Sequence, residues 1–221
     1  MNICLYTMHR EETIGEMVGI TAPNKVEYCQ RHGYGFHHET WTESMFPGFE
    51  RLPVLIHLLK CHYYDWIFWL GADALITNLS KRIEDLVDPN FGIVMATDFT
   101  QVQMDSFLVQ KKMNGLKLME KVWGHRDSPI GQWYEQSTLD SLMNTSRFRG
   151  TVKLVPQRFM NAYRHKWFSE WFEINEKIKN HEDCLGTNGE WQPGDFVFHI
   201  PGRPLETKLR ALREIVPLIQ R

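Results

Sequence analysis

Residues 65–78 read Asp65-Trp66-Ile67-Phe68-Trp69-Leu70-Gly71-Ala72-Asp73-Ala74-Leu75-Ile76-Thr77-Asn78, and they say most about the architecture. Residues 66–70 are a short, continuous apolar run, which favours a buried strand over a surface helix. The run is followed by one carboxylate, Asp73, before apolar residues resume. Burying a carboxylate is costly unless a partner neutralises it. Asp73 therefore either caps a following helix or turn or binds a metal ion next to a phosphate ligand.

The rest of the chain alternates between strand and helix patterns. Strands are predicted at 2–8, 36–40, 66–70, 91–97, 106–110, 152–155 and 195–200. Helices are predicted at 21–32, 52–64, 79–87, 116–123, 134–143 and 205–219. Residues 158–194 mix aromatic residues with charges and are predicted to be part helix and part loop. The opening strand–helix–strand order predicts an α/β domain with a largely parallel sheet flanked by helices.

Length and composition describe an ordinary globular chain. The 221 residues favour one domain, and 43% hydrophobic with 24% charged residues is a usual balance. The net charge of −2 gives no electrostatic reason to expect a nucleic-acid partner. The oligomeric state is left open.

Cysteine usage and hydropathy bear on the compartment. Cys4, Cys29, Cys61 and Cys184 include no pair at CxxC spacing, which disfavours a zinc site and favours a reducing environment. No apolar run approaches the roughly 18 residues that a membrane span needs, and no signal-peptide pattern is visible. We therefore expect a cytoplasmic protein without a membrane anchor.

Several predicted strands end in polar residues, and in such sheets ligands bind at the carboxyl ends of strands. These ends are 71–73, 97–98 and His199, with Arg203 close enough in sequence to neutralise a phosphate. A lone histidine on an apolar strand is also a common core residue, so both interpretations of His199 stay open. Together, Asp73 and His199 would give one oxygen and one nitrogen ligand to Mn²⁺ or Mg²⁺.

Four segments resemble motifs of one family and follow the same order along the chain. The segments are 24–34, 65–78, 135–137 and 191–202. The family is the GT34 retaining glycosyltransferases, which include plant xyloglucan xylosyltransferases and fungal galactosyl- and mannosyltransferases. The resemblance covers roughly residues 1–203.

This resemblance implies a single GT-A domain over residues 1–221, with a Rossmann-like sheet. Residues 1–100 would form the nucleotide-sugar-binding half and residues 101–203 the acceptor-binding half, followed by a C-terminal helix at 204–221. The implied activity is retaining transfer of a hexose or pentose from a nucleotide-diphosphate sugar, in particular a UDP-sugar, to a saccharide acceptor. Mn²⁺ or Mg²⁺ would assist the reaction.

The resemblance also assigns roles by position. The implied metal ligands are Asp73 and His199. The implied nucleotide-sugar contacts are Thr7, Arg51, Gly71, Ala72, Asp73, Gly202 and Arg203. The implied residues at the reaction centre are Asp105, Glu135 and Gln136, although an acid at the start of a helix is also favoured by the helix dipole alone.

Three positions depart from the family pattern. Gly71 stands where the family has the first acid of its Asp-x-Asp motif, which removes a charge from the implied metal site. Asp105 stands where the family often has glycine and adds a carboxylate near the donor sugar. Arg51 replaces a frequent lysine.

Other functions fit parts of the same pattern. Gly71 favours a catalytically weakened nucleotide-sugar-binding module. Another α/β nucleotidyltransferase-like enzyme would also use an acid and a divalent ion, but would release pyrophosphate. A membrane-surface role for the terminal helix, through Lys208, Arg210, Arg213 and Arg221, is the weaker hypothesis because its apolar stripe is narrow.

Overall fold

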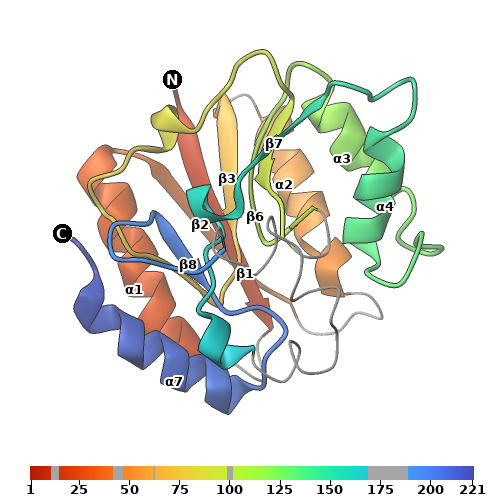
Figure 1. The fold of residues 1–221 in the computed structure, drawn as a ribbon. Helices are drawn as coiled ribbons and strands as arrows, with labels where there is room; N and C mark the ends of the chain where they lie inside the picture. The colour runs from red at the N-terminus through yellow and green to blue at the C-terminus, as the bar shows by residue number, and fades with distance from the viewer. Residues whose placement is uncertain (11–14, 42–46, 62, 99–101, 169–188) are drawn as a thin grey trace.

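A six-stranded sheet forms the centre of the computed structural model, which describes residues 1–10, 15–41, 47–61, 63–98, 102–168 and 189–221 (Figure 1). The strand order is β2-β1-β3-β6-β5-β7. The strands are β1 (Ile3–Arg10), β2 (Gly35–Trp41), β3 (Trp66–Leu70), β5 (Ile93–Ala96), β6 (Ser106–Gln110) and β7 (Val152–Val155). β6 runs antiparallel to both of its neighbours, and the other pairings are parallel. The predicted α/β fold with a mostly parallel sheet is confirmed.

The structure also has a second sheet of two strands. One of them lies within the strand predicted at 195–200, whereas the other was not predicted. β4 (Ala74–Ile76) pairs antiparallel with β8 (Val197–His199), and Ala74 lies opposite His199. The apolar residues after Asp73 are thus a short strand, where a helix or turn was one expectation. Three residues are too few to show a strand period by themselves.

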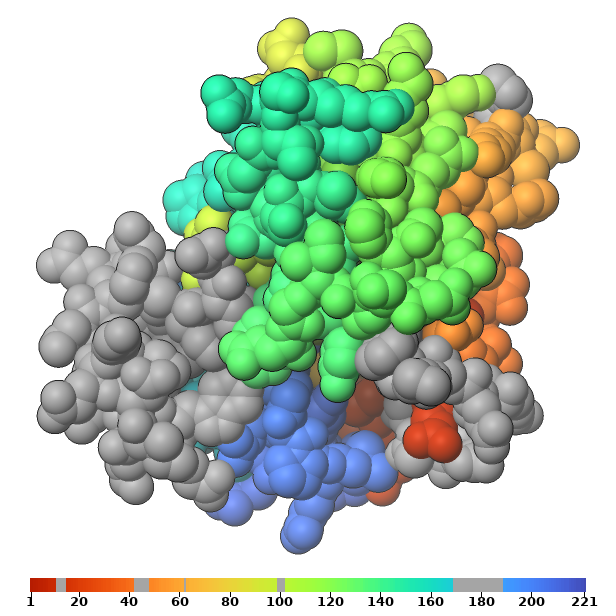
Figure 2. All heavy atoms as spheres, turned by 90° about the vertical axis from the view of Figure 1, so that its right-hand side faces the viewer, coloured from red at the N-terminus to blue at the C-terminus, as the bar shows by residue number. Residues whose placement is uncertain are grey.

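Helices cover both faces of the large sheet (Figure 1). On one face lie α1 (Gly15–His32) and, packed on it, α7 (Leu205–Ile215). On the other lie α2 (Arg51–Lys60), α3 (Gly115–Trp123) and α4 (Glu135–Met143). Figure 2 shows the side of the molecule that α3 and α4 cover, with the C-terminal residues below them. Short 3₁₀ turns are Pro47–Phe49, Ile83–Asp85, Gln157–Phe159, His165–Trp167 and Val216–Leu218.

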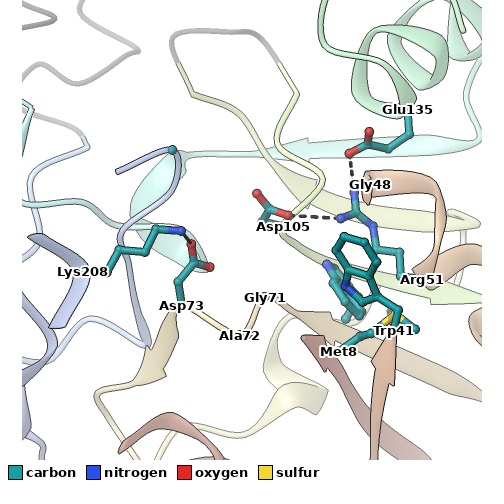
Figure 3. A pocket seen from close by; sticks show the side chains of 12 residues that line it. Met8, Trp41, Gly48, Arg51, Gly71, Ala72, Asp73, Asp105, Glu135 and Lys208 are labelled. Carbon is teal, nitrogen blue, oxygen red and sulfur yellow. Dashed lines mark hydrogen bonds and ion pairs between the residues drawn. The ribbon is translucent and has the colours of Figure 1, made fainter. Parts of the chain in front are cut away.

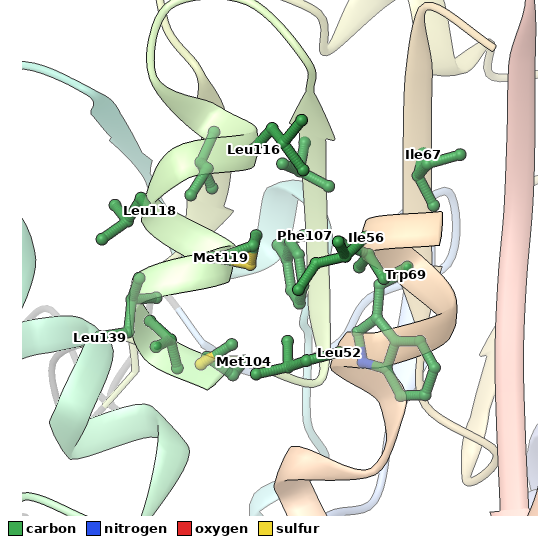
Figure 4. Packing of buried hydrophobic residues seen from close by; sticks show 14 of the residues in the cluster. Leu52, Ile56, Ile67, Trp69, Met104, Phe107, Leu116, Leu118, Met119 and Leu139 are labelled. Carbon is green, nitrogen blue, oxygen red and sulfur yellow. The ribbon is translucent and has the colours of Figure 1, made fainter. Parts of the chain in front are cut away.

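The alternation of side chains along the strands divides the core into two layers. In β3, Ile67 and Trp69 pack against α2, α3 and α4 (Figure 4), whereas Trp66, Phe68 and Leu70 pack toward α1. All five residues of β3 are buried. A strand covered on both faces has no polar positions, which explains why its sequence is a continuous apolar run.

Several predicted boundaries are wrong. α1 begins six residues before the predicted start, with Pro23 inside the helix, because Met17 in its first turns packs into the core around α7. The predicted helix at 79–87 is only the 3₁₀ turn Ile83–Asp85. Backbone groups of this segment form hydrogen bonds with distant residues in place of helical ones. For example, the Leu79 amide donates to Gln220 O at 2.9 Å. The terminal helix ends at Ile215, before Pro217.

Residues 158–194 are partly described. They contain 3₁₀ turns and extended segments, while residues 169–188 lie outside the described part, together with the helix expected in this region. No helix among the described residues is long and apolar enough to cross a bilayer. The apolar stripe of α7 is instead buried through Ala211, Leu212 and Ile215.

Gly115 and Gly19 give a matched pair of stability predictions. A Cβ at Gly115 would lie 2.3 Å from Gln110 O and 2.4 Å from Gly92 O, both of them backbone atoms, whereas a Cβ at Gly19 in α1 meets nothing within 4 Å. We expect Gly115→Ala to lower the free energy of unfolding by on the order of 3 kcal/mol through overpacking. Gly19→Ala should raise it by about 0.5–1 kcal/mol through helix propensity. Urea denaturation measures both, and equal effects would contradict the packing described.

Lys25 gives a prediction with a defined pH window. Its amine is fully buried and donates to Gly71 O at 2.9 Å. Burial lowers the pKa of Lys25 from 10.5 to about 7 in the folded state, although the charge of Asp73 opposes the shift. Between these pH values the unfolded chain binds more protons than the folded one, so this group makes the free energy of unfolding rise with pH there.

The comparison with Lys25→Met isolates that contribution. The stability of the variant relative to the wild type should fall as pH rises from about 7 to 10.5, by up to about 1.4 kcal/mol per pH unit. Denaturant midpoints across this range measure the difference, with the exposed Lys81→Met as control. A difference independent of pH would mean that Lys25 stays charged in the folded protein.

Candidate active site

A cavity of about 280 Å³ lies at the carboxyl end of β3 (Figure 3). Its walls come from segments far apart in the sequence, including β1, β2, α2, the turn after β3, and α7. The lining residues are Met8, Trp41, Gly48, Arg51, Trp69, Gly71, Ala72, Asp73, Asp105, Glu135, Gly202 and Lys208. Figure 3 shows two charged clusters, one at Asp73 and one at Arg51, separated by Gly71 and Ala72.

The first cluster surrounds the carboxylate of Asp73. Pairing of β4 with β8 places the ring of His199 next to it, with Nε2 3.1 Å from Asp73 Oδ1. The other oxygen, Oδ2, accepts a hydrogen bond from Lys208 Nζ at 2.5 Å. His199 is fully buried and Lys208 largely so. Both carboxylate oxygens are therefore engaged by side chains.

Electrostatics keep this cluster charged. Burial favours the neutral acid, but the charges of Lys208 and His199 and their hydrogen bonds hold the pKa of Asp73 well below its usual value. For Lys208, burial opposes the charge, yet the attraction of Asp73 raises the pKa above its usual value. Near neutral pH, Asp73 is a carboxylate and Lys208 an ammonium.

A buried hydrogen-bond chain fixes the ring of His199 from behind. Its Nδ1 lies 2.7 Å from Asn161 Oδ1, and Asn161 Nδ2 donates to the Tyr163 hydroxyl at 3.0 Å. That hydroxyl donates to Asp98 Oδ2 at 2.8 Å. Burial strongly raises the pKa of Tyr163, so the hydroxyl keeps its proton. Partners of this kind hold a ring in one orientation.

The same chain reaches the loop before β6. Gln103 Nε2 donates to Asp98 Oδ2 at 3.1 Å, and Gln103 Oε1 accepts from the Asp105 amide at 2.8 Å. Asp98 was expected at a polar strand end, and it is not among the residues that line the cavity. Asn161 and Tyr163 were missed because they lie in the segment whose pattern is irregular.

The second cluster is an arginine between two acids. Arg51, the first residue of α2, donates to Asp105 Oδ1 at 3.2 Å and to Glu135 Oε1 at 2.8 Å. Its guanidinium lies 5.0 Å from the ring centroid of Trp69. Burial, with the nearby charge of Asp105, raises the pKa of Glu135 despite the attraction of Arg51. A Cβ at Gly48 would lie within 2.0–2.2 Å of the Glu135 carboxylate, so a side chain there would displace this carboxylate.

The structure brings most of the predicted site residues to one cavity. Those that line it are Arg51, Gly71, Ala72, Asp73, Asp105, Glu135 and Gly202. The residues that line it but were not predicted as site residues are Met8, Trp41, Gly48, Trp69 and Lys208. Lys208 could be seen in the sequence only as one charge of an amphipathic helix, which does not show that it faces a ligand.

Four predicted residues do not line the cavity. His199 does not line it, but its Nε2 lies 3.1 Å from Oδ1 of Asp73, which does. Thr7 lies inside β1, not at its end, and its hydroxyl is buried without a partner among the described residues. Gln136 Oε1 accepts from the Met104 amide at 3.3 Å and so supports the loop that carries Asp105. The Arg203 guanidinium lies 5.9 Å from the Phe168 ring centroid.

The residues present fit a divalent cation poorly. Asp73 and His199 are adjacent, as expected of two ligands, but the described residues include no group of three or more histidine, cysteine or acidic side chains suited to a metal. One oxygen of Asp73 is already paired with an ammonium. Mn²⁺ or Mg²⁺ binding stays a prediction.

Sequence comparisons find a family match over the N-terminal part of the chain. Residues 4–90, which include β1, α1 and the segment containing Asp73, match the sequence profile of the galactosyl transferase GMA12/MNN10 family. Two proteins of Schizosaccharomyces pombe are similar over 86% of this chain: "Probable alpha-1,2-galactosyltransferase gmh1" at 21% identity and "Probable alpha-1,2-galactosyltransferase gmh2" at 22% identity. The chain spans 64% and 61% of their lengths, just under two thirds.

Solved structures show the same fold. A glycosyltransferase involved in the glycosylation of the major capsid of PBCV-1 matches with a TM-score of 0.71 and 18% identity, over 96% of this chain and 99% of that one. The galactosyltransferase LgtC, solved with donor and acceptor sugar analogs, matches with a TM-score of 0.59 and 13% identity, over 98% and 95% of the two chains. The predicted GT-A fold is confirmed, and the match over residues 4–90 supports the expected resemblance to the galactosyl transferase GMA12/MNN10 family, the GT34 glycosyltransferases.

Proposed function

We propose that this chain transfers a hexose or pentose from a nucleotide-diphosphate sugar to a saccharide acceptor, with retention of configuration. The main support is that one cavity at the carboxyl end of β3 has an ionised Asp73–Lys208 pair on one side and Arg51 between two acids on the other. The names of the two yeast relatives make galactose the first sugar to test. UDP is the carrier that the family resemblance implies.

The two clusters suit different parts of such a donor. The diphosphate would lie near Gly71 and Lys208, where a glycine permits close approach of the ligand and an ammonium offers hydrogen bonds to phosphate oxygens. The backbone there is fixed, because the Gly71 amide donates to Asp105 O at 2.8 Å and the Gly71 carbonyl accepts from Lys25. The sugar would lie near Asp105 and Glu135, whose oxygens can accept from its hydroxyls.

Retention is proposed to occur by attack on the same face. The bond between the anomeric carbon and the diphosphate oxygen breaks, the acceptor hydroxyl oxygen bonds to that carbon, and the hydroxyl proton passes to the leaving phosphate oxygen. Asp105 and Glu135 would stabilise the positive charge that develops on the sugar. Each already binds Arg51 through one oxygen, which suits holding and charge stabilisation better than nucleophilic attack.

Product analysis distinguishes the alternatives. Incubation with a panel of nucleotide sugars, UDP-galactose first, should release the nucleoside diphosphate. Release of pyrophosphate would indicate a nucleotidyltransferase-like enzyme. Binding of the nucleotide without release of any product, with and without a panel of saccharide acceptors, would indicate a sugar-nucleotide-binding module.

Asp73→Asn tests the diphosphate side. We expect release of the nucleoside diphosphate to fall by at least about 100-fold, because Lys208 loses the carboxylate that holds it in place. Asp88→Asn is the control, since Asp88 also pairs with a lysine, Lys153, but does not line the cavity. Unchanged turnover of Asp73→Asn would remove this residue from the mechanism.

Glu135→Gln tests the sugar side. Turnover should fall by roughly 10- to 100-fold, while affinity for UDP, which lacks the sugar, changes by less than about twofold. Glu120→Gln, which breaks a surface pair with Lys60, serves as control. Steady-state kinetics and UDP titration calorimetry measure the two effects. A parallel loss of UDP affinity would place Glu135 at the nucleotide instead.

A further inference from the structure

We propose that the Lys208 ammonium is the resident cation of the diphosphate site and that this chain binds its nucleotide without a divalent metal ion. The inference rests on the proposed function, because it assigns the group that receives the diphosphate in that reaction.

The first observation is how Lys208 is placed. It lies in the first turn of α7, 135 residues from Asp73 in sequence, and its side chain enters the cavity to reach the carboxylate (Figure 3). α7 is fixed on the domain by the buried residues Ala211, Leu212 and Ile215. Because the helix is anchored and the side chain is mostly buried, the ammonium is held at this point of the cavity and does not move freely in solvent.

The second observation is the number of acids. Between Leu70 and Ala74 the chain offers one carboxylate, Asp73, because position 71 is glycine. A Cβ at Gly71 would lie 3.0 Å from Asp73 Oδ1, so a side chain there would crowd the carboxylate that binds Lys208. The carboxylate of Asp73 and the ammonium of Lys208 together carry a net charge of zero. A site with two carboxylates and one divalent ion also has a net charge of zero. The diphosphate therefore faces the same net charge in either arrangement.

The third observation is that both carboxylate oxygens of Asp73 already have side-chain partners. Oδ2 binds Lys208, and Oδ1 lies 3.1 Å from His199 Nε2. A divalent ion bound to this carboxylate would lie next to the ammonium, and the two cations would repel each other. Asp73 is thus better suited to anchor Lys208 than to hold a metal.

The fourth observation is what the ammonium still offers. A lysine ammonium has three N–H donors, and the contact with Asp73 uses one. Lys208 lines the cavity together with Gly71 and Gly202, where a ligand's phosphate oxygens can approach its other donors closely.

Titration calorimetry of the full chain with UDP and GDP tests the inference. Metal-stripped protein is titrated once in EDTA and once in excess MnCl₂. We expect one of the nucleotides to bind in EDTA with an affinity within about threefold of that in Mn²⁺. Lys208→Met should lose at least tenfold in both buffers, and Lys208→Arg should recover part of that loss. Arg210→Met, which removes an exposed positive charge from the same helix, should bind like the wild type. Circular dichroism confirms that each variant is folded.

The outcomes separate the two proposals. Binding by the wild type that requires Mn²⁺, or binding that Lys208→Met leaves unchanged, overturns the metal-independent site but not glycosyl transfer. If a variant fails to fold, the nucleotide affinities of the wild type in EDTA and in Mn²⁺ still show whether binding requires a metal ion. If neither nucleotide binds in either buffer and no nucleotide sugar is consumed, the proposed function itself fails, and this inference with it.

Discussion

The antiparallel pairing of β4 with β8 is the constraint on which the rest of the site depends. It joins residues 74–76 to residues 197–199, and so puts the Asp73 carboxylate next to the His199 ring. Asn24 of α1 secures this pair by exchanging two side-chain hydrogen bonds with the backbone of Ile76, at 2.8 and 3.0 Å. An edge strand of three residues is weak by itself. Held in this way between a helix and a partner strand, it becomes a fixed support for a charged group.

The walls of the cavity carry charged side chains that would otherwise be exposed to water. Buried ion pairs contribute little net stability because desolvation offsets their attraction. Two such clusters on one cavity, Asp73–Lys208 and Arg51 with its two acids, are therefore better explained by a ligand than by stability. The clusters are separated by Gly71 and Ala72, which have little or no side chain, and the proposed diphosphate and sugar would lie in the space between them.

Some strands and helices could be located from the sequence, and others could not. β3 and β6 were placed to the residue, because strands buried on both faces are continuous apolar runs bounded by polar residues. The helix expected at 79–87 does not form, although its apolar spacing suggested one. Its backbone amides and carbonyls are engaged by distant partners such as Gln220, and a local pattern cannot report such partners. The same reason hid β4, whose three residues are a strand only because β8 lies beside them.

Local chemistry along the chain was enough to indicate the α/β class, the family resemblance, and Asp73 and His199 as candidate site residues at the ends of predicted strands. Arg51, Asp105 and Glu135 became candidates only through the resemblance, position by position. Which of them share a cavity was decided by tertiary structure alone. Lys208 shows this most clearly: in sequence it is one cation of an amphipathic helix, and only the packing of α7 on α1 brings it to Asp73. Side-chain contacts across more than a hundred residues depend on how helices and strands pack, and no periodicity or spacing along the chain encodes them.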